Sequence, residues 1–149
     1  MIELALFEPE IPQNTGTLLR VGACFGLKIH LIEPCGFIFS SRRMKRAGMD
    51  YIDQVDYEIH NSWEEFHSTM QQKGKRTILL TPHTNQSYLD FSYATNDVLI
   101  LGRESDGVPT HVAKAVDNAV VIPMKNGTRS LNVAISGGIV VSEALRQIT

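Results

Sequence analysis

Short apolar runs recur along the chain, and most of them are closed by proline, glycine or a polar cluster. Runs of this length that are apolar on both faces are typical of strands inside a parallel sheet, whereas helices need longer stretches with a period of about 3.6 residues. A proline at the end of a run is a further signal, because it cannot donate to a neighbouring strand. The predicted strands are Ile2–Phe7, Lys28–Ile32, Val55–Ile59, Thr77–Leu80, Val98–Leu101 and Ala119–Ile122.

Helix signals fall between these runs. Asn14 and Thr15 can cap a helix that runs to about Cys24, and Arg20 lies off its apolar stripe. A capping box begins at Ser62 and opens a helix to about residue 72. The other helices are predicted over Ser40–Ala47 with Gly48 as the stop, from Pro109 to about Val116, and after a cap at Ser130. Strands that alternate with helices predict an α/β fold with a mainly parallel six-stranded sheet and helices on both faces.

Composition agrees with this fold class. With 149 residues, of which 43% are hydrophobic and 20% charged, the chain is expected to form a single domain over residues 1–149 with a substantial core. No apolar run is as long as a membrane span, and no basic lead-in to a signal peptide follows Met1, so we expect a cytoplasmic location. Cys24 and Cys35 form no CxxC pair. A net charge of -2 excludes a uniformly basic surface but leaves room for a local basic patch.

Three predicted strand ends carry distinctive loops. They are Leu80-Thr81-Pro82, the segment from Gly102 to Gly107, and Ile122-Pro123-Met124. Ligands of open parallel sheets bind at such carboxyl ends. The loops lack the phosphate-binding signatures GxxxxGK[ST] and GxGxxG. Backbone groups near Leu80, Ile122, Met124 and Leu131 would instead suit a flat aromatic base with a small polar group. Taken alone, the stretch that leads into the last helix favours an ordinary strand-to-helix connection.

Three motifs resemble those of the SPOUT RNA 2'-O-ribose methyltransferases, in the same order. They are Ile11-Pro-Gln-Asn14-Thr-Gly16-Thr-Leu-Leu-Arg20, Leu101-Gly102-Arg-Glu104-Ser-Asp-Gly107-Val-Pro109, and Ile122-Pro-Met through Arg129-Ser130-Leu131-Asn132. Ile32-Glu33-Pro34 with Gly36-Phe37, and Arg46-Ala47-Gly48-Met49-Asp50-Tyr51, are similar to the minimal branch that methylates the wobble nucleotide of tRNA. Ala134-Ile135 replaces a polar pair common in that branch, and Gly137-Gly138 is unusual inside a helix, which indicates close helix packing within the subunit or across a dimer.

The resemblance implies S-adenosylmethionine as methyl donor, S-adenosylhomocysteine as product, and a deep trefoil knot in the C-terminal third. The residues that it places on or near the cofactor are Leu80, Thr81, Gly102, Glu104, Gly107, Ile122, Met124, Ser130 and Leu131. For the side chains of Leu80 and Ile122, plain core packing is an equal alternative.

Arg20 matches the family arginine assigned to the reacting hydroxyl. A free guanidinium is always protonated, so we expect Arg20 to orient the hydroxyl and stabilise the developing alkoxide, while an RNA phosphate or water takes the proton. The other residues that the resemblance assigns to the catalytic site are Asn14, Glu104, Ser130 and Asn132. For Asn14, capping of the first helix is the favoured role.

No metal is expected, because the histidines at positions 30, 60, 67, 83 and 111 show no ligand spacing. Taken alone, the dense basic cluster Arg42, Arg43, Lys45 and Arg46 is typical of a solvated helix face. The resemblance instead implies that it is the RNA-binding surface, with Phe37, Phe39 and Tyr51 beside it as stacking surfaces. The resemblance also implies a tRNA substrate and a C2 homodimer.

Three alternatives stay open at this point. The chain could be a SPOUT methyltransferase for rRNA or another tRNA position, or a non-catalytic RNA-binding module that kept the knot. The strand pattern alone also allows a flavodoxin-like small-molecule binder.

Overall fold

The structure is a computed structural model that describes residues 1–46, 50–128 and 130–149. Its centre is a six-stranded parallel sheet in the order β3-β2-β1-β5-β4-β6. The strands are β1 (Glu3–Phe7), β2 (Lys28–Ile32), β3 (Tyr57–His60), β4 (Arg76–Leu80), β5 (Asp97–Leu101) and β6 (Asn118–Val120). The strand order reverses between β1 and β5, and such a switch point is where open α/β sheets bind ligands.

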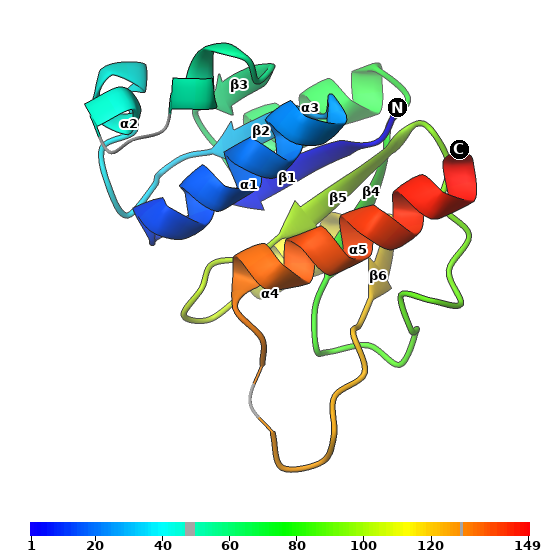
Figure 1. Ribbon diagram of the computed structural model, residues 1–149. Helices are drawn as coiled ribbons and strands as arrows, with labels where there is room; N and C mark the ends of the chain where they lie inside the picture. The colour runs from blue at the N-terminus through cyan, green and yellow to red at the C-terminus, as the bar shows by residue number, and fades with distance from the viewer. Residues whose placement is uncertain (47–49, 129) are drawn as a thin grey trace.

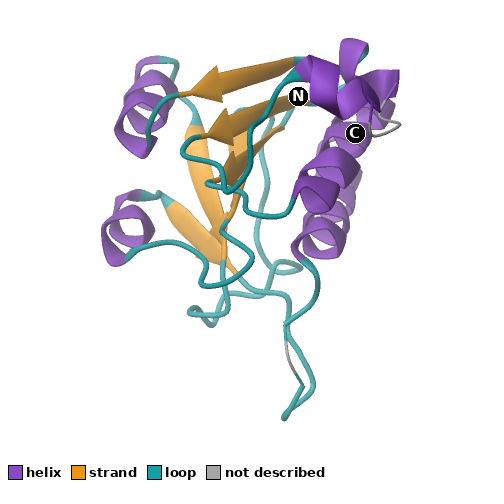
Figure 2. Cartoon of the chain, turned by 90° about the vertical axis from the view of Figure 1, so that its left-hand side faces the viewer, coloured by secondary structure: helices purple, strands orange, loops and turns teal. Residues whose placement is uncertain are grey.

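Helices cover both faces of the sheet (Figures 1 and 2). They are α1 (Pro12–Phe25), α2 (Ser41–Arg46), α3 (Trp63–Gln72), α4 (Thr110–Ala115) and α5 (Val133–Ile148), with a short 3-10 helix, η1 (Asp50–Asp53). Alternate residues of the central strand supply two cores. Leu4 and Leu6 belong to the core under α1 and α5, and Phe7 packs with Trp63 and Phe66 of α3 on the other face.

This architecture confirms the predicted α/β class, the parallel sheet and the helices on both faces. The knot remains a prediction that the family resemblance implies. Two strand boundaries differ from the prediction by two residues, since β3 begins at Tyr57 and β6 ends at Val120, and the other boundaries agree within one residue. Val55 instead packs into the core before β3 begins, and Val121 forms only an isolated bridge with Ser87. The predicted helix over residues 40–47 is found as α2, while Ala47 and the stop at Gly48 lie outside the described residues.

Both predicted caps of the motif helices were wrong. The N-cap of α1 is Ile11, because Pro12 fits the first turn of the helix and Asn14 and Thr15 therefore lie inside it. The N-cap of α5 is Asn132 rather than Ser130, and its side-chain oxygen accepts from the amides of Ala134 and Ile135. None of the described helices combines the length and the apolar character that a bilayer crossing requires.

Gly137 and Gly138 have different environments. A Cβ atom on Gly137 would lie 2.7 Å from Leu101 Cδ1 and 2.8 Å from Leu18 Cδ2, so the missing side chain lets α5 approach α1 and β5 closely. A Cβ atom on Gly138 would meet nothing within 4 Å. Gly137 therefore has the packing role within the subunit that the sequence indicated, and Gly138 faces open space.

Candidate cofactor and catalytic site

The three predicted cofactor loops begin side by side at the carboxyl edge of the sheet. Leu80 of β4 pairs with Leu101 of β5 on one side and with Val120 of β6 on the other. The chain leaves these strands through Thr81, Gly102 and Val121, so segments far apart in sequence start from one place. After β6, residues 121–128 extend away from the sheet (Figure 1).

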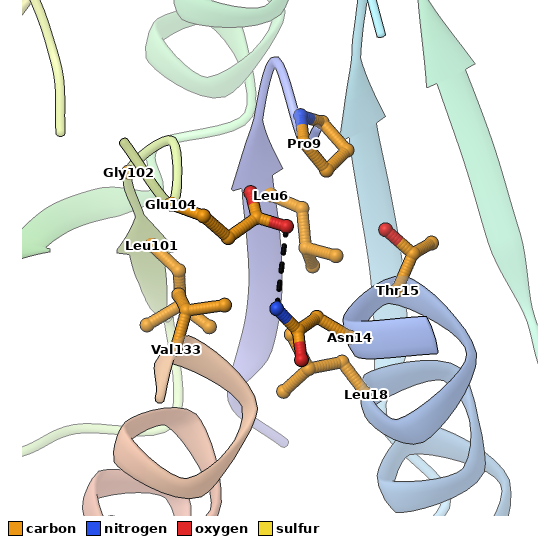
Figure 3. A pocket seen from close by; sticks show the side chains of 9 residues that line it. All are labelled: Leu6, Pro9, Asn14, Thr15, Leu18, Leu101, Gly102, Glu104 and Val133. Atoms are coloured by element: carbon orange, nitrogen blue, oxygen red, sulfur yellow. Dashed lines mark hydrogen bonds between the residues drawn. The ribbon is translucent and has the colours of Figure 1, made fainter. Parts of the chain in front are cut away.

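Glu104 ties the loop after β5 to the start of α1. Its carboxylate accepts from the amides of Glu10 at 3.0 Å and Ile11 at 2.7 Å. It also accepts from the Asn14 side-chain amide at 3.4 Å (Figure 3). An acidic group at a helix N-terminus satisfies unpaired amides and complements the helix dipole. Glu104 therefore supplies the capping interaction that the sequence had assigned to Asn14.

Asn14 extends this contact to the last motif. The Asn132 side-chain amide donates to Asn14 Oδ1 at 2.9 Å. The Asn132 oxygen accepts from the amides of Ala134 at 2.8 Å and Ile135 at 3.2 Å. The Glu104–Asn14–Asn132 chain thus joins all three sequence motifs through side-chain hydrogen bonds.

Glu10 is a site residue that the sequence reasoning missed. Its carboxylate accepts from the Ser105 amide at 2.9 Å and the Ser105 hydroxyl at 3.1 Å, while its own amide donates to Glu104. The two loops therefore hold each other through reciprocal contacts. The residues are more than 90 positions apart, so no local spacing could have indicated the pair.

A small cavity of about 10 Å³ lies beside Asn14 (Figure 3). The buried hydroxyl of Thr15 lines it and has no hydrogen-bond partner in the described part of the chain. The cavity has room for about one water molecule and is far too small for a nucleoside. Its lining residues are Leu6, Pro9, Asn14, Thr15, Leu18, Leu101, Gly102, Glu104 and Val133.

Gly102 and Gly107 are required by the loop that they bound. A Cβ atom on Gly102 would lie 2.7 Å from Gly107 Cα, and Gly107 has a φ of 69°. The Arg103 and Gly107 backbones exchange hydrogen bonds of 2.9 and 3.1 Å across this closure. Arg103 adds ion pairs with Glu8 at 3.2 Å and Asp106 at 2.8 Å. The loop is thus a rigid element at the strand end.

The segments predicted to hold the cofactor offer unpaired main-chain groups beside apolar side chains. Ile122, Met124 and Leu131 make no backbone–backbone hydrogen bond to another described residue. Leu80 and Ile122 are half-buried against the core, while Met124 and Leu131 are 40% and 38% exposed. Free amides and carbonyls next to apolar surface fit an adenine ring and its polar edge.

The predicted ligand contacts of Thr81 and Ser130 have less support in the structure. The Thr81 amide donates to Val120 at 2.9 Å, and its hydroxyl accepts from the His83 amide at 3.2 Å. Ser130 is exposed and caps no helix. Arg129, which precedes it in the motif, lies outside the described residues.

Arg20 lies apart from the Glu104–Asn14–Asn132 chain. It is exposed on α1, and its guanidinium carbon lies 5.6 Å from the centroid of the Tyr51 ring. Among the described residues, no hydrogen bond or ion pair joins Arg20 to Asn14, Glu104, Ser130 or Asn132. The structure therefore groups three of the five predicted catalytic residues and leaves Arg20 and Ser130 outside that group.

The basic cluster is exposed on α2. Arg42, Arg43, Lys45 and Arg46 all face solvent, whereas Met44 is buried and anchors the helix. Of the predicted stacking residues, Phe39 packs edge-on against Tyr57 with ring centroids 5.4 Å apart, and Tyr51 lies beneath Arg20. Phe37 is half-buried.

Two histidines, His30 and His60, form a buried pair on the face of the sheet that α3 covers. His30 Nδ1 lies 2.9 Å from His60 Nε2, and His30 Nε2 lies 3.0 Å from a Glu3 carboxylate oxygen. With Glu58 they form a group whose potential ligand atoms lie within 4.8 Å of one another, which sequence spacing did not indicate. These potential ligand atoms already have partners within the protein: the two histidine rings share a hydrogen bond, and Glu58 forms an ion pair with Lys28 at 3.0 Å.

The fold defines an α/β protein with a parallel sheet, and the carboxyl edge of that sheet is its candidate ligand site. Comparison with known proteins makes the class specific. The sequence profile of the SpoU rRNA Methylase family matches residues 1–142, and the chain belongs to this family.

Its relatives include proteins with a defined target. A tRNA (cytidine(34)-2'-O)-methyltransferase from Beijerinckia indica is 48% identical over 97% of this chain and 91% of its own length. A solved structure that concerns the 2-OH methylation of C/U34 on tRNA matches with a TM-score of 0.90 and 38% identity, over 99% of this chain and 90% of the other. An AdoMet-bound rRNA methyltransferase from Sinorhizobium meliloti matches with a TM-score of 0.88 and 26% identity, over 99% of this chain and 57% of the other.

Proposed function

We propose that this protein transfers a methyl group from S-adenosylmethionine to the ribose 2'-hydroxyl of nucleotide 34, cytidine or uridine, in tRNA. The similarity to C/U34-specific relatives over nearly the whole length supports this target. The structural observation that carries the proposal is the Glu104–Asn14–Asn132 chain, which assembles the three motifs beside the cofactor loops. We also propose that residues 1–149 act as one domain, since a single sheet carries both cores.

The main-chain groups of Ile122, Met124 and Leu131 would hold the cofactor, with Leu80 and Ile122 against the adenine ring. When bound, S-adenosylmethionine supplies a methyl group on a positively charged sulfonium. Methyl transfer depends on the alignment of the methyl donor with the ribose hydroxyl. The closed loop from Gly102 to Gly107, held by the Glu104 contacts, would keep the cofactor-binding loops in place for that alignment.

Arg20 would orient the ribose hydroxyl and stabilise negative charge that develops on it. Because a guanidinium stays protonated, Arg20 cannot take the proton itself, and a phosphate of the RNA or a water molecule would accept it. The exposed cations of α2 would bind the tRNA backbone and position the anticodon loop.

Arg20 and the Glu104 chain are separate within one subunit, which favours a C2 homodimer in which a neighbouring copy helps to complete the site. The surface of α5 offers a contact region. Ile135 is 55% exposed there, beside the open side of Gly138 and a groove that includes Tyr88 and Ile139. A tRNA substrate also implies a cytoplasmic location.

The test is methylation of unmodified tRNA with methyl-labelled S-adenosylmethionine, followed by nuclease digestion and mass spectrometry. Label on the ribose of nucleotide 34 is the expected result. A matched tRNA with 2'-deoxyribose at that position alone should accept no label. Label on rRNA or at another tRNA position would show that nucleotide 34 is not the target. Absence of S-adenosylmethionine binding by calorimetry would overturn the whole proposal.

A further inference from the structure

Tyr51 contacts the turn of α1 that presents Arg20. The guanidinium carbon of Arg20 lies 5.6 Å from the Tyr51 ring centroid, and the Tyr51 hydroxyl donates to the main-chain oxygen of Gly16 at 2.5 Å. Gly16 and Arg20 are four residues apart, so they lie on the same side of the helix. Tyr51 is thus attached to one helical turn both by its hydroxyl and by its ring.

The short helix η1 that carries Tyr51 is fixed on both sides. Ile52 is only 2% exposed and anchors η1 in the core. η1 packs against both α1 and α2, and Lys45 of α2 forms an ion pair with Asp53 at 2.8 Å. One element therefore contacts both the predicted RNA-binding helix and the helix of the predicted catalytic arginine.

The Tyr51 hydroxyl is unsuited to act as a proton acceptor. Burial raises the pKa of Tyr51, although the charge of Arg20 lowers it, and the phenol therefore stays protonated near neutral pH. Its proton is donated to Gly16. What Tyr51 offers Arg20 is the ring, which attracts a cation and leaves its charge and its donors available.

We propose that Tyr51 is a positioning residue for methyl transfer: its ring holds the Arg20 guanidinium in the orientation that meets the ribose hydroxyl, and η1 couples this orientation to RNA bound on α2. The proposal rests on the proposed function and adds a residue that acts only through Arg20. It also gives Tyr51 a different role from the base-stacking surface expected from sequence, because Arg20 lies over its ring.

The first test compares two substitutions at this position with a matched control. Tyr51→Leu removes the ring and should lower kcat about 10-fold or more, with little change in KM for tRNA, since misplacement of a reacting group is costly. Tyr51→Phe keeps the ring and should recover most of that loss, to within about 5-fold of the unaltered enzyme. Tyr57→Leu removes another half-buried tyrosine, packed on Phe39 away from Arg20, and should leave kcat unchanged.

The second test asks whether Tyr51 acts through Arg20. In an Arg20→Ala background, Tyr51→Leu should lower kcat no further, because a residue that works only through a partner has no effect once the partner is removed. An equal additional loss in that background, or an unchanged kcat for Tyr51→Leu alone, would overturn the proposal. Loss of kcat in Tyr57→Leu to the same degree would also overturn it, because the effect would then be general destabilisation.

A measurement without substrate separates this inference from the proposed function. In the unaltered protein the Arg20 side-chain protons should show an NMR ring-current shift, which Tyr51→Phe keeps and Tyr51→Leu abolishes. An Arg20 shift that persists in Tyr51→Leu would contradict the positioning contact, whatever the protein methylates. If the shift behaves as expected but tRNA is not methylated, the proposed function fails and the arginine–tyrosine contact stands.

Discussion

The two edges of the parallel sheet differ in how they use polar side chains. At the amino edge, polar groups are paired inside the fold: Asp97 is fully buried, accepts from Arg76 Nε at 2.6 Å and Nη2 at 2.8 Å, and also accepts from the Ala94 amide at 2.7 Å. Asp117 likewise bonds to Thr77 at 2.8 Å. At the carboxyl edge, side chains link separate loops, and the main-chain groups of Ile122, Met124 and Leu131 form no backbone hydrogen bond with another described residue. We therefore expect the amino edge to contribute mainly to stability and the carboxyl edge, where the predicted site residues lie, mainly to function.

The largest effect is expected for Arg20, the predicted catalytic arginine. Arg20→Ala should lower kcat about 10²- to 10³-fold, the usual cost of losing one donor to a developing oxyanion. Because Arg20 is exposed, the free energy of unfolding should change by less than about 0.5 kcal/mol. Single-turnover kinetics and urea unfolding measure the two quantities. A large loss of stability with normal turnover would remove Arg20 from the proposed catalytic residues.

The second effect belongs to the amino edge. Asp97→Ala should lower the free energy of unfolding by about 3 kcal/mol, because it leaves the Ala94 amide without its acceptor and the Arg76 guanidinium with only the Ser92 carbonyl oxygen. Chemical denaturation checks the value, and calorimetry below the unfolding temperature should find unchanged affinity for S-adenosylmethionine. Asp90→Asn, an exposed acid on the neighbouring loop, is the control and should change neither.

Asn132 allows capping and cofactor binding to be separated. Asn132→Asp keeps the oxygen that caps α5 but removes the donor to Asn14 Oδ1, so the cap should hold while affinity for S-adenosylmethionine falls about 5-fold. Asn132→Ala removes both and should also cost about 1 kcal/mol of stability. Equal affinity in all three proteins, measured by calorimetry, would show that the link to Asn14 has no part in the site.

The smallest effect is a dependence of stability on pH. Burial and the neighbouring His30 lower the pKa of His60 below its ordinary 6.5, so the unfolded chain binds more protons and stability should begin to fall as the pH drops through 6.5. Burial would raise the pKa of Glu3, but His30 and Lys75 together lower it from 4.5 to about 2. Its contribution is therefore present above pH 4.5 and is lost as the pH falls toward 2.

Denaturation curves between pH 7 and 3 measure this dependence, and Glu3→Gln should flatten the lower part of the profile. Methyl transfer assayed well above pH 6.5 should be normal in this variant, since Glu3 belongs to the amino edge. A Glu3→Gln profile identical to that of the unaltered protein would remove Glu3 from the stabilising set.

The strands could be predicted because burial on both faces leaves a local mark in the sequence. The runs at β1 and β5 are apolar except for their first residue, and β2 has apolar residues at three of its five positions; the structure confirms all three strands within one residue. The helix starts at the motifs could not be predicted in the same way. Asn14 has the chemistry of a cap, but its partners Glu104 and Asn132 come from distant parts of the chain.

The site was predictable to the extent that its residues follow strand ends. Strand pairing brings Leu80, Leu101 and Val120 together, as expected for parallel strands. The Glu10–Glu104 exchange and the contact of Tyr51 with Arg20 depend on how loops and helices pack, for which single-sequence patterns carry no signal. The roles of the individual site residues stay predictions for the experiments above.

The lack of a side chain at Gly137 sets the distance of α5 from the sheet. At Gly137, α5 approaches Leu18 and Leu101 so closely that an alanine would have to displace both leucine tips. Asn132 is the N-cap of that helix, little more than one turn before Gly137, and would shift with the helix wherever the leucines did not yield. The close packing of α5 at residue 137 thus sets how far the Asn132 amide reaches toward Asn14, so a substitution away from the predicted site can weaken the link between two of its motifs.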